Sequence, residues 1–452
     1  MTTRREFLKQ ASLIAAASAL PAKSFGLNFF SKKKVVIIGA GFAGLSCALM
    51  LKNNGFDVTV IEARKRVGGR VFSYRPDANS DLVIELGAEW IGASHNRVID
   101  ICKKYGIEIE DNTFRDRLIY DNKFYKPGEW NYSPEWKEKF DRIIEGYAKM
   151  NEQDKKKLDK MDWWRYLVNN GISDKDLDIR EYADSTDFGE SIRFVSAYAA
   201  LAEYAESSEN NEMDFKAKGG NGLITEALAN DLGASNIRLG TKVLSVRHSS
   251  SINVQCDNGD NFECDYLVCT VPTYSLMKIN WDPVLPQDKI EAINSLQYAR
   301  INKCATVFSE RFWDEDGYSI LSDTFSHYFY HATKNQKKQN GVLISYSIGD
   351  KADMFSRMNK DQRINTVAAS LELPAGDIKK YVLDNINYYW GGDEYSKGAY
   401  ALYGKGQWFS VMPVIKEKTG NIFFAGEHLA DWQGFMEGAV NSGEEAAEGI
   451  LS

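Results

Sequence analysis

The chain has 452 residues, of which 44% are hydrophobic and 26% are charged, and its net charge is −8. This size allows roughly two or three globular domains, and the acidic balance argues against nucleic acid as a partner. Six cysteines in so long a chain do not form a disulfide framework. The five histidines include no HxH or HExxH pair, so we expect no metal site.

The first predicted segment, residues 1–32, is a targeting signal and linker. Residues 3–9, TRREFLK, match the twin-arginine export signal, and the mildly apolar run 11–22 that follows is too short to span a bilayer. Small residues alternate at 19–22, as a cleavage site requires. We therefore expect the twin-arginine translocase as a partner, and a soluble periplasmic or exported protein without a stable membrane anchor. The alternative is an ordinary basic N-terminal helix.

A glycine motif follows the first predicted strand, residues 35–38. Gly39, Gly41 and Gly44 have the Gly-x-Gly-x-x-Gly spacing of a dinucleotide site, and a helix follows them. Gly39 allows a tight turn, Gly41 lets the backbone approach phosphates, and Gly44 lets helix and strand pack closely. The N-terminus of the helix offers N–H groups and partial positive charge to a pyrophosphate. A glycine-rich turn without a ligand is the alternative.

The second predicted strand, residues 58–61, supports the dinucleotide interpretation because it ends in Glu62, which is placed to accept hydrogen bonds from a ribose. Residues 63–70, ARKRVGGR, then pair two glycines with arginines. Such a loop suits phosphate, although a basic surface turn has the same composition. A third strand is predicted at 83–86.

A mostly helical block is predicted after residue 96. We expect a helix at 96–105, a Ser133-Pro134 helix start and a helix at 194–204. The charge run 152–160 is interpreted as a solvated face or turn. The acid-rich stretch 203–214 could attract a polyamine, but such runs are more often solvated.

The second half of the chain returns to β structure. Strands are predicted at 237–239, 242–246, 252–256 and 262–270, with an Asn258-Gly259 hairpin turn, as a two- or three-stranded inserted ribbon. Cys256 and Cys264 flank this turn and could pair, although two reduced cysteines are favoured. Later elements are predicted as strands at 305–308, 342–346 and 422–425 and as helices at 361–371 and 436–451.

In this order, these stretches resemble the flavin-dependent amine oxidases, most closely the monoamine oxidases, over nearly all of the chain after residue 33. Residues 39–44, 62–64 and 68–70 are shared with phytoene desaturases and protoporphyrinogen oxidases, so they imply FAD without a substrate. Residues 423–427, FFAGE, and 432–440, WQGFMEGAV, are more specific to amine oxidases. By resemblance, Glu427 binds the ribityl chain, and the helix from Met436 directs its N-terminus at the flavin.

The resemblance also implies the catalytic residues. Lys303, in the stretch INKC, corresponds to a lysine that reaches the flavin N5 atom through a water; a surface lysine on a strand is the alternative. Tyr400 and Phe435 correspond to the two walls of an aromatic cage for the amine, with core packing as the alternative. Ala399 stands where monoamine oxidases have the cysteine that bonds to the flavin, so we expect non-covalent FAD.

The resemblance implies a set of FAD-contacting residues that is spread over the chain. They are Gly39, Gly41, Phe42, Ala43, Gly44, Glu62, Ala63, Arg64, Gly69, Arg70, Gly87, Ala88, Glu89, Trp90, Val243, Trp390, Gly426, Glu427, Phe435, Met436 and Ala439. The implied fold is α/β, with a Rossmann-like FAD-binding domain of the glutathione-reductase type and an inserted α+β substrate domain. We assign 33–90, 215–289 and 395–452 to the first domain and 91–214 and 290–394 to the second.

The expected reaction is FAD-dependent oxidation of a primary or secondary amine to an imine, which water hydrolyses to an aldehyde or ketone. The electron acceptor is expected to be O2, giving H2O2, with a periplasmic electron carrier as the alternative. L-amino acid oxidases usually carry an arginine three residues after the glycine that corresponds to Gly87, where this chain has Trp90, although Arg193 or Arg300 could serve instead. A desaturase or porphyrinogen-type oxidase and a non-catalytic flavoprotein are the other classes. The oligomeric state stays open, and a dimer is compatible with the sequence.

Overall fold

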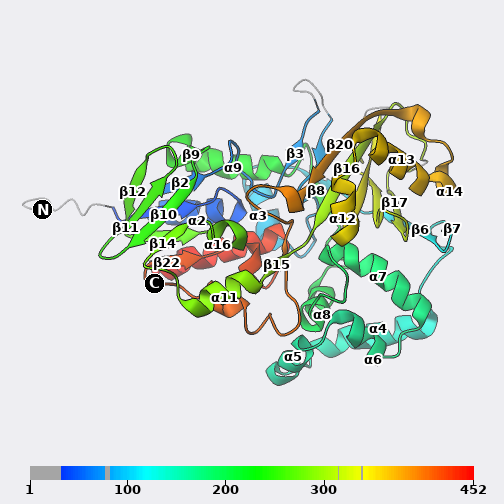
Figure 1. Ribbon diagram of the computed structural model, residues 1–452, viewed down its shortest axis with the longest axis horizontal. Helices are drawn as coiled ribbons and strands as arrows, with labels where there is room; N and C mark the ends of the chain where they lie inside the picture. The colour runs from blue at the N-terminus through cyan, green and yellow to red at the C-terminus, as the bar shows by residue number, and fades with distance from the viewer. Residues whose placement is uncertain (1–31, 77–81, 314, 337–339) are drawn as a thin grey trace, which may run out of the picture. The chain divides into compact units, whose positions relative to one another are not determined.

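The computed structural model describes residues 32–76, 82–313, 315–336 and 340–452 (Figure 1). The predicted export signal lies outside these residues. Both helices and sheets are present, so the α/β prediction is confirmed. None of the helices within the described ranges is long and apolar enough to cross a bilayer.

A five-stranded parallel sheet forms the first layer. Its order is β22-β13-β1-β2-β9, with bounds Ile422–Phe424, Tyr266–Cys269, Lys34–Ile38, Asp57–Glu62 and Ile237–Leu239. The four apolar residues of β1 alternate between two cores, as the period of a strand requires. Val35 and Ile37 pack with the helices on one face, whereas Val36 and Ile38 pack on the other. The strand is therefore buried on both sides, as its sequence predicts.

Helices cover one face of this sheet. They are α2 (Phe42–Asn53), α16 (Met436–Leu451), α3 (Asn96–Lys104) and α9 (Gly222–Leu232). α2 and α16 lie side by side although they come from opposite ends of the described chain (Figure 1). Gly443 makes this possible, because a Cβ atom there would lie 2.2 Å from the main-chain oxygen of Ala43.

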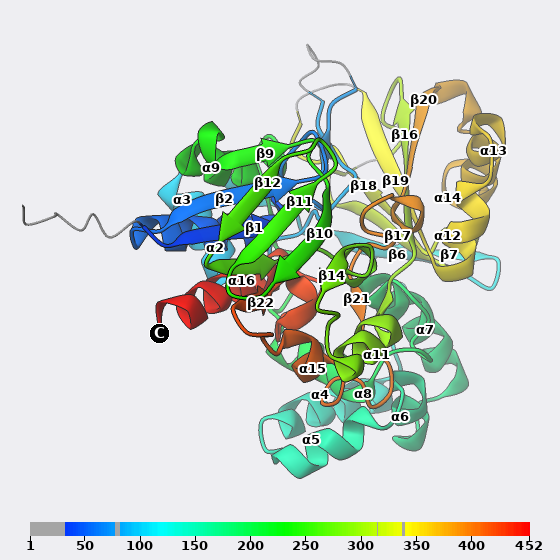
Figure 2. The same cartoon turned by 60° about the vertical axis from the view of Figure 1, so that its left-hand side comes forward.

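A four-stranded sheet covers the other face (Figure 2). Its order is β12-β11-β10-β14, with bounds Asn261–Cys264, Ile252–Cys256, Val243–His248 and Asn280–Asp282. The sequence predicted a ribbon of two or three strands, whereas the sheet has four because β14 joins it. The predicted single strand 262–270 is also wrong, because the chain changes sheets at Asp265, which exchanges two hydrogen bonds with the main chain of Lys34.

Cys256 and Cys264 are both free in this sheet. Cys264 lies opposite Ile252, four residues along β11 from Cys256. At about 3.3 Å per residue, this register keeps the two thiols too far apart to bond. The favoured interpretation as two reduced cysteines is confirmed.

A seven-stranded sheet forms a separate layer, at the right in Figure 1. Its order is β20-β16-β19-β18-β17-β6-β7, with bounds Val382–Tyr389, Ile301–Phe308, Gly341–Ile348, Tyr328–His331, Tyr318–Ser322, Arg115–Tyr120 and Lys123–Tyr125. Helices α12 (Gly349–Ser356), α13 (Lys360–Ser370) and α14 (Glu372–Ala375) lie beside it. Cys304 and Phe308 of β16 pack in the core that contains Phe355 of α12. The alternation of the strand therefore turns Lys303 to the opposite face.

A helical block of five helices follows the chain order that the sequence predicts. It contains α4 (Pro134–Tyr147), α5 (Glu152–Asp159), α6 (Trp163–Asn169), α7 (Asp174–Phe188) and α8 (Ala197–Glu206). Ser133 caps α4 by accepting from the Trp136 amide, which confirms the predicted start. The charge run 152–160 is helix α5, and α8 begins at Ala197, after its cap Ser196.

The remaining elements are short. They are β3 (Ser73–Tyr74), β4 (Ile84–Glu85), β5 (Ile109–Asp111), β8 (Phe215–Ala217), α10 (Thr273–Leu276), α11 (Gln287–Ser295), β15 (Gln297–Tyr298), β21 (Ala401–Leu402), α15 (Met412–Lys416) and the 3-10 turns η2 (Ala234–Asn236), η3 (Lys379–Tyr381), η4 (Trp390–Gly392) and η5 (Glu427–Leu429).

Candidate active site

A cavity of about 610 Å³ lies where the layers meet. The residues that follow β1, β2, β13 and β22 line one end, so the cavity opens at the carboxyl ends of the parallel strands, the usual ligand position in such sheets. The Lys303 face of β16 lines another part. Residues of α7 and α8 line the third part.

The glycine turn after β1 leaves room at the cavity wall. Gly39 has a φ of +108°, and a Cβ atom on Gly44 would lie 1.9 Å from the Gly39 oxygen, so both positions exclude side chains. A Cβ atom on Gly41 would meet no heavy atom within 4 Å. The first turn of α2 has no acidic residue, and no side chain caps it. Free helix N–H groups beside open space fit a pyrophosphate.

The carboxylate of Glu62 lies beside this turn. It accepts hydrogen bonds from the amides of Ala40 and Arg64, both at 2.8 Å. Arg64 in turn forms a 2.5 Å ion pair with Asp393. The guanidinium of Arg66 donates to the main-chain oxygens of Val67, Gly69 and Val71, so the predicted glycine-arginine loop is held in shape by its own side chain.

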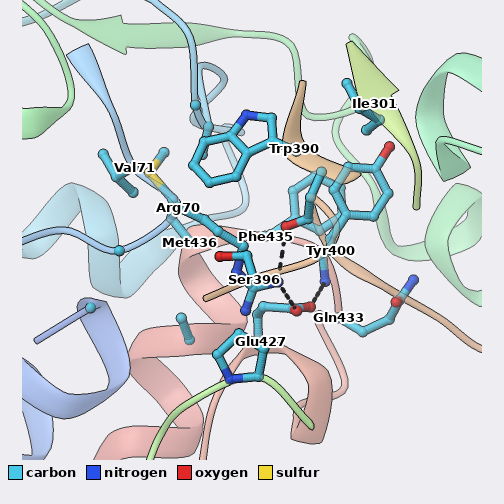
Figure 3. A pocket seen from close by; sticks show the side chains of 18 of the residues that line it. Arg70, Val71, Ile301, Trp390, Ser396, Tyr400, Glu427, Gln433, Phe435 and Met436 are labelled. Carbon is cyan, nitrogen blue, oxygen red and sulfur yellow. Dashed lines mark hydrogen bonds and ion pairs between the residues drawn. The ribbon is translucent and has the colours of Figure 1, made fainter. Parts of the chain in front are cut away.

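The C-terminal segment builds another part of the cavity wall. Arg70 forms a 2.5 Å ion pair with Glu427, whose other oxygen accepts from the Gly434 amide at 2.8 Å (Figure 3). Helix α16 begins next to these residues without a side-chain cap, and Phe435, Met436 and Ala439 line the cavity. Residues at two helix N-termini, of α2 and α16, thus line one cavity, an arrangement that fits a dinucleotide carrying a second electron-poor ring system.

All residues that the sequence assigned to FAD or to catalysis lie in the wall of this cavity, with one exception. Gly44 lies behind the wall and packs against the main chain of Gly39. This position suits the role predicted for it, which is close packing of helix on strand.

Lys303 is buried, with 4% of its surface exposed, so the alternative of a surface lysine is wrong. Its ammonium donates to the main-chain oxygens of Gly87 at 2.9 Å and Glu85 at 3.1 Å, and to the Glu89 carboxylate at 3.3 Å. The hydroxyl group of Tyr330 donates to the same carboxylate at 2.6 Å. Burial raises the pKa of the nearby Glu85 to about 7. Lys303 is therefore held at the cavity wall by a buried polar network.

The rings of Tyr400 and Phe435 both line the cavity (Figure 3). The Tyr400 hydroxyl donates to the main-chain oxygen of Asp187 at 2.7 Å, and burial raises its pKa well above the ordinary value, so the phenol stays neutral. Phe435 packs edge-to-face on His95, with ring centroids 5.1 Å apart. Burial lowers the pKa of His95 to about 4, so this support is uncharged at neutral pH.

The end of the cavity at α7 and α8 contains acidic residues from two segments, and the sequence singled out only the stretch 203–214. Asp184 and Asp187 of α7 line it, together with Glu203 of α8 and Glu212. Arg180 lies there too, but it is paired with Asp184 at 3.0 Å. The helical spacing of residues 180, 184 and 187 places their side chains on one face of α7. This spacing is visible in the sequence and could have been used to predict the charged face.

Neither arginine considered for a substrate carboxylate lies in the cavity wall. Arg300 forms ion pairs with Glu190, Asp350 and Asp353. Arg193 is exposed and stacks over the ring of Trp164 at 3.9 Å. The acidic end of the cavity therefore suits a cationic ligand better than an anionic one.

Comparisons with known proteins agree with this geometry. A family model described as flavin containing amine oxidoreductase matches residues 42–451. The chain is 28% identical to flavin-containing amine oxidase A of Sus scrofa, over 92% of this chain and 85% of the relative. It is 26% identical to the L-amino-acid oxidase of Protobothrops flavoviridis, over 92% and 88%.

Two solved structures share the fold. Putrescine oxidase bound to putrescine has a TM-score of 0.82 at 24% identity, with 93% of this chain and 99% of that chain covered. Cyclohexylamine oxidase from Brevibacterium oxydans has a TM-score of 0.82 at 20% identity, with 93% and 98% covered.

Proposed function

The chain belongs to the flavin-containing amine oxidoreductases, as the family match over residues 42–451 shows. We therefore propose that the protein binds FAD in this cavity and uses it to oxidise a primary or secondary amine. The single observation that carries the choice of an amine over an amino acid is the acidic end of the cavity. There, Arg180 is already paired with Asp184, so a substrate carboxylate would meet unpaired acids.

The proposed FAD contacts follow from the residues that line the cavity. The free N–H groups at the start of α2 would bind the pyrophosphate, and Glu62 would bind the ribose of the adenosine part. Glu427 and the start of α16 would bind the ribityl chain and the flavin ring. When bound, FAD supplies a two-electron acceptor for a hydride from the carbon beside the amine nitrogen.

Within this proposal, the chain's own residues orient the amine and exclude water. The flat faces of Tyr400 and Phe435 hold the neutral amine between them, since both rings lie in the cavity wall and each is fixed from behind. Lys303 has three donors, and its longest bond, to Glu89, is the one that a water molecule could replace most readily. Water then hydrolyses the imine product to an aldehyde or ketone.

The proposal includes non-covalent attachment of the cofactor. In the described part of the chain no cysteine or histidine side chain lines the cavity, and Ala399 occupies the wall where monoamine oxidases are expected to have their cysteine. Acid precipitation should therefore release all flavin into the supernatant. Flavin that stays with the denatured protein would contradict this part of the proposal.

We propose O2 as the electron acceptor, with H2O2 as product, and export by the twin-arginine translocase to the periplasm. The proposal for export depends on residues 3–9 alone. A reporter fused behind residues 1–32 should reach the periplasm, and the matched fusion with Arg4 and Arg5 changed to lysine should stay inside the cell. Equal export of both fusions would overturn it.

Anaerobic stopped-flow mixing tests the reaction itself. The purified holoenzyme should lose its flavin absorbance with amines and keep it with the matching L-amino acids, which add only a carboxylate. Bleaching by amino acids alone would replace the proposal with L-amino acid oxidation. Admitting O2 afterwards should restore the absorbance and produce H2O2 in equal amount; recovery only with an electron carrier would exclude O2.

A further inference from the structure

The acidic end of the cavity has more hydrogen-bond acceptors than donors. Asp187 accepts from the Tyr204 hydroxyl at 2.8 Å and from the Asn211 amide at 3.0 Å. On the facing helix α8, the side-chain carboxyl group of Glu203 forms no hydrogen bond or ion pair with any described residue. Both carboxyl groups line the cavity, so a ligand there meets at least one carboxyl group without a partner.

Two amide oxygens at the same end also lack donors. The Oε1 atom of Gln433 and the Oδ1 atom of Asn211 are buried and have no hydrogen-bond partner among the described residues, and Gln433 is only 8% exposed. Both residues line the cavity, and Gln433 and Glu203 also share a small adjoining hollow. A buried acceptor without a donor destabilises the site, so this arrangement favours a ligand that brings donors.

The cation in this part of the wall, Arg180, forms no hydrogen bond with these acceptors. The guanidinium of Arg180 donates to Asp184 at 3.0 Å and lies over the ring of Phe140 at 3.8 Å. The Tyr204 hydroxyl is already donated to Asp187. The missing partner is therefore positively charged, carries several N–H donors and fits an enclosed space, which describes an alkylammonium group.

We propose that this end of the cavity binds the second, cationic nitrogen of a diamine or longer polyamine, while its first, neutral amine lies between Tyr400 and Phe435. This inference rests on the proposed function and narrows its substrate class. The two positions are adjacent, because the hydroxyl group of Tyr400 donates to the main-chain oxygen of Asp187. One substrate could therefore span from the aromatic rings to the acidic residues.

Without a ligand, the buried acids at this end hold their protons more tightly than exposed carboxyl groups do, because their pKa values are raised. Burial and then the charge of Asp184 raise the pKa of Asp187 to about 7. Burial, followed by the charges of Asp187, Glu212 and Asp184, raises the pKa of Glu203 well above its ordinary value. The other titratable groups near Asp187 are Glu203, Arg180, Tyr132, Tyr204, Tyr328, Tyr346 and Tyr400. An ammonium group at this position would stabilise the ionised carboxylates, so its binding should release protons.

The test compares diaminoalkanes with monoaminoalkanes of matched chain length on the holoenzyme. Anaerobic flavin reduction, followed over amine concentration, gives an apparent Kd and a limiting rate for each amine. We expect the wild type to favour the diamine by about tenfold or more in Kd, and Glu203→Gln to lose most of that preference. Asp187→Asn is the second variant, because it removes the other carboxylate.

The matched control is Glu209→Gln, which changes an exposed acid in the same acidic stretch and should leave the preference intact. The flavin content of each variant shows that it is folded and loaded. If wild type and both cavity variants bind the two amines alike while the flavin is still reduced, the inference is overturned and the proposed function stands. If no amine reduces the flavin, both the inference and the proposed function are overturned.

Discussion

The ammonium group of Lys303 lies 3.3 Å from the carboxylate of Glu89, and both side chains are buried. This pair joins the face of the seven-stranded sheet to the segment that follows β4. The same ammonium donates to the main-chain oxygens of Glu85 and Gly87, so one side chain fastens this segment to the seven-stranded sheet at the cavity wall. Its substitution should affect both chemistry and stability.

We expect Lys303→Met to retain FAD and to slow flavin reduction or reoxidation by about 100-fold or more, as loss of a group that positions a proton or water does. Stopped-flow measurement of each half-reaction checks this. The control is Lys289→Met, a buried lysine that instead binds the main-chain oxygens of Val414, Ile415 and Glu417. Normal turnover of Lys303→Met would show that the lysine has no part in the reaction.

Lys303→Met should also lower the free energy of unfolding, by about 3–5 kcal/mol, because Glu89 loses its cationic partner in a buried place. The double variant Lys303→Met/Glu89→Gln should recover part of this loss, since no buried charge then lacks a partner. Chemical denaturation of the loaded proteins gives both values. A double variant less stable than the single one would mean that Glu89 is compensated by other groups.

Tyr400→Phe keeps the ring and removes the hydroxyl hydrogen bond to Asp187. A neutral hydrogen bond contributes about 1 kcal/mol, so kcat/KM for an amine should fall about fivefold. Tyr400→Ala removes the cavity wall itself and should cost far more. Steady-state kinetics separates the two. Equal losses in both variants would assign the whole effect to the hydroxyl group and none to the ring.

Gly41→Ala should lower FAD content without destabilising the fold. The residue has a φ of −80°, which alanine adopts freely, and its Cβ would meet no protein atom within 4 Å. The methyl group would instead occupy the space proposed for the pyrophosphate. The ratio of flavin to protein absorbance measures the loss. The control is Gly146→Ala, because Gly146 lies in α4 and also has no close neighbours. Full FAD content in Gly41→Ala would show that the pyrophosphate does not bind beside this residue.

Glu85 should make stability depend on pH. Burial raises its pKa from 4.5 to about 7, so between these values the folded state keeps a proton that the unfolded state has released. Stability therefore falls as pH rises through this window, and Glu85→Gln removes that fall. The variant should melt like the wild type near pH 4.5 and at a higher temperature near pH 8. Parallel melting curves at all pH values would show that Glu85 is charged in the folded state.

The phosphate end of the cavity could be predicted because its determinants are local. The strand, Gly39, Gly41 and the helix follow one another directly, and Glu62 ends the adjacent strand. The position of Lys303 could also be predicted in part, since strand alternation decides its face once Cys304 is assigned to the core. The hydrogen-bond acceptors of Lys303 could not be predicted, because Gly87 and Glu89 belong to a segment distant in sequence and reach the lysine only through tertiary packing.

At the acidic end of the cavity, composition alone could not predict which acids are exposed and which line the cavity. The expectation that residues 203–214 form a solvated face is wrong for Glu203 and Glu212, which line the cavity, and correct for Glu209, which is exposed. These acids differ in exposure because α8 packs beside α7 at the cavity, which covers some of their side chains and leaves others in solvent. Helical spacing places Asp184 and Asp187 on one face, but it does not say which neighbour that face meets.

The close approach of Gly443 to Ala43 has a consequence for how the protein is made. The two helices that meet there begin at Phe42 and Met436, so the ribosome releases them far apart in time. Until α16 emerges, α2 has no neighbour on that side, and the part of the proposed FAD site that α16 supplies does not exist. Cofactor uptake must then be among the last events of maturation, and a ribosome that stalls before α16 would yield a chain unable to retain flavin.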